Sequence, residues 1–225
     1  MQPRPIVYCE TNWIVALAFP HHQHHRLARE LRDQAHRGEC EIRLPYAAVL
    51  EAPHPITEES KRLGNAFALL RDELANALQN GQADFAAIAA SLGSDAMKQY
   101  LARPALDTVA DLVKDPHIKL LRELEPALRK MDELRSGLNF RGKDRVDLYV
   151  LAAVVSDRLA DGDMARTAIF FSTNKKEFQP KIEAQAKMGE LFYEPYRIVW
   201  RSDFDLEPAV RHWKQQFMAR PVMES

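Results

Sequence analysis

The sequence is poor in cysteine and has no long uninterrupted apolar run. Its 225 residues include only two cysteines, Cys9 and Cys40. A disulfide framework is therefore not expected, and a reducing compartment fits the chain best. No apolar run is long enough to span a bilayer, and the first residues do not form a signal-type apolar stretch. We therefore expect a soluble, cytoplasmic protein with no membrane partner.

Several common catalytic motifs are also missing. The chain has no Gly-rich phosphate loop, no Cys pairs at zinc spacing and no nucleophile elbow around a serine. These absences exclude the dehydrogenases, kinases and hydrolases that depend on such motifs. A phosphatase of the aspartyl-phosphate type would need an Asp directly after the first apolar run and a second Asp two residues later. Glu10 and Asn12 occupy those two positions instead.

The charge balance excludes a globally basic nucleic-acid binder. The chain carries 31 Lys and Arg against 32 Asp and Glu, for a formal net charge of -1. Local basic patches are still compatible with this balance. With 46% hydrophobic residues, a chain of 225 residues can bury a core of its own. We expect a single domain over residues 1–225.

Short apolar runs predict the strands of a parallel sheet. Ile6–Cys9 and Ala168–Phe171 are continuously apolar, as strands buried on both faces are, and a polar turn and a helical pattern follow each of them. Further strands are predicted at residues 41–44 and within 191–200. Helices are predicted at residues 11–18, 25–35, 46–52, 144–159, 175–187 and 207–218, with Pro53 and Pro55 ending the third. The pattern indicates an α/β fold in which helices sandwich a parallel β-sheet.

The stretch from residue 57 to 135 has helical apolar spacing throughout. Breaks near Gly81, Gly93, Pro104 and Asp115-Pro116 divide it into about four helices, and no strand is predicted there. We interpret it as an inserted helical lobe. Dimerisation, gripping of a substrate and docking of a partner are all open as its role.

Acidic residues recur at the ends of the apolar runs. Glu10 closes the run 6–9, Glu51 closes the run 47–50, and Asp144 and Asp147 open the run 146–155. Ligands of α/β proteins gather at the carboxyl ends of the strands. Carboxylates that cluster there repel one another unless a cation such as Mg²⁺ or Mn²⁺ neutralises them. The pattern therefore indicates a hydrolytic metal site.

The order of these motifs resembles the PIN-domain family of metal-dependent ribonucleases, which includes many toxins of bacterial toxin-antitoxin pairs. The resemblance lies in residues 8–12 (YCETN), 49–52 (VLEA), 144–153 (DRVDLYVLAA) and 171–178 (FSTNKKEF). It covers roughly the first fifty residues and residues 142–178. It implies a PIN-like parallel sheet sandwiched by helices and a metal-dependent endoribonuclease, one of whose forms is the toxin of a toxin-antitoxin pair.

Two positions depart from the usual pattern of the family. Glu10 stands where the family usually has Asp, and Lys175 stands where it usually has another Asp. The glutamate is one methylene longer but can still ligate a hard divalent cation. The protonated lysine cannot be a ligand, and its charge would partly replace that of a second metal ion. We therefore expect one firmly held Mg²⁺ or Mn²⁺ ion.

The resemblance, together with the basic residues that flank the acids, predicts the roles of the residues at the site. The catalytic residues and metal ligands would be Glu10, Glu51, Asp144 and Asp147, with Glu51 acting through a water ligand or orienting the attacking water. The substrate-binding residues would be Thr173, Asn174, Lys175, Arg141 and Lys143, whose donors and charges suit a phosphate backbone. The expected partners are single-stranded or structured RNA, an antitoxin protein and a second copy of the chain.

Structural interpretations of the same residues stay open. Asp144 and Asp147 also suit the capped start of a helix, Glu51 suits a solvated helix end, and Thr11 and Asn12 could cap a helix or hold Glu10 and water. The run from His21 to His25 is interpreted as a surface loop. The alternative function is a catalytically degenerate PIN-like module that binds RNA or a protein partner, with Glu10 and Lys175 marking a lost metal site.

Overall fold

The protein is built on a five-stranded, all-parallel β-sheet. The structure is a computed structural model that describes residues 3–79, 95–122, 124–137, 145–174 and 188–218. Its strands are β1 (Ile6–Cys9), β2 (Glu41–Pro45), β3 (Ile118–Leu121), β4 (Ala168–Phe171) and β5 (Ile198–Arg201), in the spatial order β3-β2-β1-β4-β5. Every neighbouring pair is parallel. The prediction of an α/β fold with a parallel sheet is confirmed.

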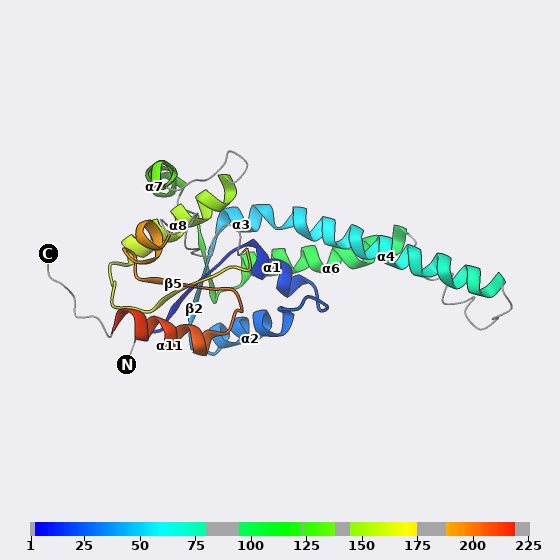
Figure 1. The fold of residues 1–225 in the computed structure, drawn as a ribbon, viewed down its shortest axis with the longest axis horizontal. Coiled ribbons are helices and arrows are strands. Elements are labelled where there is room, and N and C mark those ends of the chain that lie inside the picture. The colour runs from blue at the N-terminus through cyan, green and yellow to red at the C-terminus, as the bar shows by residue number, and fades with distance from the viewer. Residues whose placement is uncertain (1–2, 80–94, 123, 138–144, 175–187, 219–225) are drawn as a thin grey trace.

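Helices cover both faces of the sheet, as Figure 1 shows. The helices are α1 (Thr11–Ala18), α2 (His25–His36), α3 (Tyr46–Glu51), α4 (Pro53–Gln79), α6 (Asp95–Lys114), α7 (Leu124–Gly137), α8 (Arg145–Asp161) and α11 (Leu206–Phe217), with a π-helical turn at Gly189–Tyr193. In Figure 1, α7 and α8 lie on one side of the sheet, and α2 and α11 lie on the other. Helices α4 and α6 pack against each other and extend away from the sheet. Of the helices described, none is long and apolar enough to cross a membrane.

The alternation of side chains along β1 explains the two cores. Val7 and Cys9 belong to the core shared with α1, α2 and α6, whereas Ile6 and Tyr8 belong to the core shared with α7 and α8. All four side chains are fully buried. Because successive residues of a strand point to opposite faces, a strand covered on both faces is continuously apolar. This burial accounts for the run from which the strand is predicted.

Two predictions for the stretch from 57 to 135 are wrong. β3 lies within it and pairs with β2, so the stretch is not purely helical. The missed strand is short, and its Lys119 is exposed because β3 is an edge strand. The break predicted at Pro104 is also wrong, since α6 continues through this proline. Burial of α6 at Val109 and Leu112 offsets the one hydrogen bond that the proline cannot donate.

Two smaller differences concern the ends of predicted elements. α3 does end at Glu51, but Pro53 starts α4 instead of stopping the helical path. A proline in the first turn of a helix loses no bond, because the N–H groups there have no partner within the helix. In the range 191–200, the π-helical turn precedes the single strand β5. The helix predicted at 175–187 lies outside the described residues.

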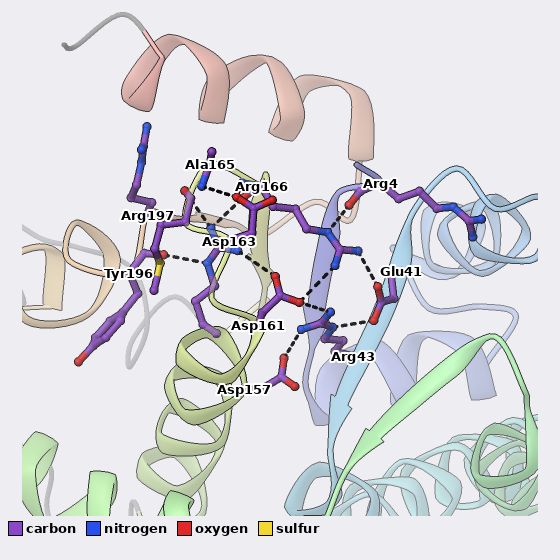
Figure 2. Close-up of polar contacts among 12 residues, drawn as sticks. Arg4, Glu41, Arg43, Asp157, Asp161, Asp163, Ala165, Arg166, Tyr196 and Arg197 are labelled. Atoms are coloured by element: carbon purple, nitrogen blue, oxygen red, sulfur yellow. Dashed lines mark hydrogen bonds and ion pairs between the residues drawn. The ribbon is translucent and has the colours of Figure 1, made fainter. Parts of the chain in front are cut away.

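A buried ionic network fastens α8 to the sheet, and Figure 2 shows it. Arg43 of β2 is 3% exposed. Its three nitrogens donate to Glu41 Oε1 at 2.8 Å, to Asp157 Oδ2 at 2.6 Å and to Asp161 Oδ1 at 2.8 Å. The two aspartates stand four residues apart on α8, so one face of the helix presents both carboxylates to β2.

Other side chains complete the network. Tyr8 of β1 donates its hydroxyl to Asp157, and Arg166 contacts Asp161 and Glu41. Burial on its own would raise the pKa of Glu41, but the hydrogen bonds from Arg43 and Arg166 lower it to about 2. The network thus fixes α8 on the sheet, and α8 carries Asp147 in its first turn.

Candidate active site

The order of the strands creates a topological switch point between β1 and β4. From β1 the chain proceeds to β2 and β3 on one side, whereas β4 and β5 lie on the other. Crevices that bind ligands form at such a point, outside the carboxyl ends of the strands. β1 ends at Cys9 and is followed by Glu10, and β4 ends at Phe171 and is followed by Ser172. Glu10 and Ser172 therefore face the switch point from its two sides.

Glu10 is the N-cap of α1 and is 5% exposed. Its Oε2 accepts the backbone N–H of Asn12 at 3.0 Å. Its Oε1 is buried and has no hydrogen-bond partner among the described residues. A buried carboxylate oxygen without a partner is uncommon, because leaving it so costs free energy. Glu10 thus caps the helix with one oxygen, and the Ser172 hydroxyl also lies close enough to lower the pKa of its carboxyl.

Burial and a neighbouring negative charge both disfavour the ionised form of Glu10. Burial raises the pKa of Glu10 from 4.5 to about 7, against the lowering effect of the N–H of Asn12 and of the Ser172 hydroxyl. The negative charge of Asp147 adds to the rise, so Asp147 lies close enough to repel Glu10. Asp147 is half-buried in the first turn of α8. These two predicted acids therefore lie within reach of each other's charge.

The turn after β4 has the same local geometry as the turn after β1. The Asn174 N–H donates to Ser172 Oγ at 3.0 Å, two residues back, as the Asn12 N–H donates to Glu10. The sequences ETN and STN at the two turns match in the same way. Ser172 is fully buried, whereas Thr173 and Asn174 are half-buried. Thr173 and Asn174, which were predicted to bind substrate, therefore lie at the switch point.

β2 leads the chain to the same edge of the sheet, and α3 follows it. Glu51 is the last residue of α3. Its Oε2 accepts a hydrogen bond from the hydroxyl of Thr11, the residue that follows Glu10. Sequence reasoning gave Thr11 a choice between capping a helix and holding Glu10. In the structure, Glu10 itself caps the helix, and the Thr11 hydroxyl donates to Glu51.

Several predicted site residues cannot be placed. Asp144, Lys175, Arg141 and Lys143 lie outside the described residues. Within the part of the chain that the structure describes, no three His, Cys, Asp or Glu side chains are arranged to hold a metal ion. The described part of the predicted quartet consists of Glu10, Asp147 and Glu51.

Sequence reasoning gave Ser172 no contact with an acid, and for Thr11 it offered Glu10, whereas the structure shows Thr11 in contact with Glu51. Both directly adjoin the end of a buried strand or its acid, and this position was the available signal.

The histidine run forms the predicted loop: residues 21–24 make turns, and α2 begins at His25. His21 contacts Glu59 at 3.0 Å, and His25 contacts the carbonyl of Ala16 at 2.8 Å.

Comparison with known proteins gives no match. Neither a family model, nor a curated protein, nor a solved structure matches this chain.

Proposed function

We propose that the protein is a metal-dependent endoribonuclease of PIN type that hydrolyses phosphodiester bonds of RNA. The observation that carries the proposal is the buried Glu10 carboxylate, whose Oε1 has no partner among the described residues and which is repelled by Asp147. This arrangement raises the free energy of the folded protein. A bound cation would remove this cost in free energy. Glu10 stands at the switch point, where α/β proteins bind their ligands.

The donor chemistry of the site fits Mg²⁺ or Mn²⁺. Both ions prefer carboxylate oxygens, and Glu10 and Asp147 supply them. Asp144, outside the described residues, is retained from the motif order as the third ligand. When bound, such an ion lowers the pKa of water and stabilises negative charge on a phosphate. A single ion is expected, because Lys175 replaces an acid at the place where a further ligand would stand.

The remaining residues would hold the substrate and the attacking water. Glu51 contacts the hydroxyl of Thr11, the residue that follows Glu10, and a carboxylate there would orient water for in-line attack. Thr173 and Asn174 offer a hydroxyl and an amide at the carboxyl end of β4 for contacts with phosphate. Lys175, Arg141 and Lys143 would neutralise the RNA backbone. An antitoxin protein and a second copy of the chain remain expected partners.

Cleavage of labelled RNA tests this proposal. Wild-type protein should cut a single-stranded RNA and an RNA hairpin in Mn²⁺ or Mg²⁺, but not in chelator. The Glu10→Gln, Asp147→Asn double variant should cut no faster than the wild type in chelator, because both ligand charges are gone. The matched control is Glu194→Gln, Glu207→Gln, which removes two exposed acids and should cut like the wild type.

The same assay separates the two functions predicted from the sequence. A catalytically degenerate module would bind RNA or a protein without cutting. Wild-type protein that leaves both RNAs intact in either metal would contradict the nuclease. Wild-type cleavage that persists in the double variant would contradict the proposed ligands instead.

A further inference from the structure

The outer edge of β5 is unpaired in the described part of the chain. β5 is the last strand of the sheet, and β4 is its neighbour on one side. The carbonyl of Arg201 accepts the Ser172 N–H, so the backbone of Arg201 faces β4. Because the backbone groups of successive strand residues point to opposite sides, the N–H and C=O of Trp200 face away from the sheet. The indole N–H of Trp200 is also buried without an acceptor among the described residues.

A cavity of about 440 Å³ lies along this edge. All of β5 lines it, together with Gly189 and Tyr193 of the π-helical turn and His212 and Gln216 of α11. The π-helical turn packs into the core that α8 shares with the sheet, whereas α11 packs into the core on the other face. Figure 1 shows α8 and α11 on these opposite sides. β5 therefore forms the floor of a groove, the β5 groove, whose walls are the π-helical turn and α11.

The shape of the β5 groove suits an extended peptide better than a second copy of the chain. A peptide strand that joins a free sheet edge gains main-chain hydrogen bonds, and pockets for its alternate side chains give specificity. The edge of β5 lies between two walls, so the same edge of a second copy would lie between walls of its own. The walls of the two copies would meet before the two edges could pair. A single extended segment avoids this clash.

The charges at the β5 groove favour a basic segment. Arg201 and Asp203 both line the groove and form an ion pair with each other, so their charges balance. Glu194 also lines the groove and is exposed, and no described residue pairs with its carboxylate. The groove therefore carries an excess of negative charge, which a Lys or Arg of the incoming segment would complement.

We propose that the β5 groove binds an extended, basic segment of a partner protein as an additional strand of the sheet. The N–H and C=O of Trp200 pair with the main chain of the segment, and Glu194 pairs with its Lys or Arg. The inference does not depend on the proposed nuclease activity, because neither Glu10 nor Asp147 lines the groove.

Selection from random peptides of about six residues, the usual length of a strand, tests the proposal. The wild type should enrich peptides in which Lys or Arg stands among alternating apolar residues, and labelled copies of these peptides should bind it in solution. Methylating the peptide nitrogens one at a time should weaken binding at every second position, because alternate N–H groups of a strand point toward its neighbour. Failure to enrich any peptide, or equal effects at consecutive positions, would overturn the proposal.

Gly189→Leu places a side chain in the β5 groove without straining the backbone. Gly189 does not have a positive φ, and a Cβ built on it meets nothing within 4 Å. We expect this variant to keep the wild-type melting temperature and to bind the selected peptides about tenfold more weakly, because leucine takes up space that the peptide needs. Unchanged peptide binding by folded Gly189→Leu would overturn the proposal. If Gly189→Leu does not fold, Gln216→Trp fills the groove from α11 and gives the same comparison.

A charge variant and its control test the basic character of the segment. Glu194→Gln should weaken binding of the selected peptides, and replacing their Lys or Arg by Gln should remove this difference. Glu207→Gln is the matched control, because Glu207 is an exposed acid that does not line the groove, and it should bind like the wild type. Equal binding by Glu194→Gln and the wild type would overturn the pairing with Glu194.

Sedimentation distinguishes a partner segment from a second copy. If a second copy occupied the β5 groove, the wild type would sediment as a dimer and Gly189→Leu as a monomer, and this outcome would overturn the proposal. We expect Gly189→Leu to leave the sedimentation of the protein unchanged.

Discussion

Replacing Glu10 by glutamine should make the metal-free protein more stable at pH 8, by about 3 kcal/mol. The reason is that burial raises the pKa of Glu10 from 4.5 to about 7, and Asp147 adds repulsion. At pH 8 the folded wild type must therefore carry a buried charge that the unfolded chain carries in water. Glutamine has no charge, and its amide oxygen can still accept the Asn12 N–H. Urea unfolding in chelator measures the difference.

The stability of the wild type should change with pH in a definite direction. Because the folded state holds the Glu10 proton more tightly than the unfolded state does, wild-type stability should fall as pH rises from about 4.5 to about 7. Below pH 4.5 the two proteins should be equally stable, and above pH 7 the difference should be constant. Glu207→Gln, at an exposed acid paired with Arg211, should show no such change. A Glu10→Gln variant that is less stable than the wild type at pH 8 would contradict this account of Glu10.

Replacing Arg43 by methionine should lower the free energy of unfolding by about 3 to 5 kcal/mol. The guanidinium is buried and is bonded to Glu41, Asp157 and Asp161. Methionine fills similar space but leaves the three carboxylates around it without their central cation. Asp157 keeps Tyr8 and Lys119, and Asp161 keeps Arg166, so the remaining network only partly compensates. Urea unfolding at pH 7 measures the loss.

The matched control for Arg43 is Arg211→Met. Arg211 also pairs with a carboxylate, at 2.8 Å from Glu207, but both side chains are exposed. Exposed pairs contribute little to stability, so this variant should unfold almost like the wild type. Equal stabilities of the two variants would show that the network of Figure 2 does not fasten α8 to the sheet.

The strands could be predicted where burial on both faces requires a continuous apolar run in the sequence. β1 and β4 have the predicted bounds, because strands covered on both faces must be continuously apolar. β3 could not be found in this way, since Lys119 is exposed at the edge of the sheet and the strand adjoins helical patterns. Arg43 could have predicted the ionic network, but the sequence analysis did not use it. An arginine inside a buried strand requires buried acids, and Asp157 and Asp161 stand one helical turn apart.

The candidate site could be predicted in part. Glu10 after β1 and Asp147 at the start of α8 lie within reach of each other's charge, as the pattern of acids predicts. The contact between Thr11 and Glu51 does not follow from it, because it depends on how α1 and α3 pack at that edge. Asp144 and Lys175 lie outside the described residues, so their predicted roles remain predictions.

Calorimetric titration of the metal-free protein with Mn²⁺ at pH 8 tests the central claim most directly, because it needs no knowledge of the RNA. The wild type should bind one Mn²⁺ ion, Glu10→Gln should lose most of the affinity, and Glu207→Gln should bind like the wild type. The same binding should raise the melting temperature of the wild type above that of Glu10→Gln. Absence of Mn²⁺ binding by the wild type, or equal binding by Glu10→Gln, would contradict a metal site centred on Glu10.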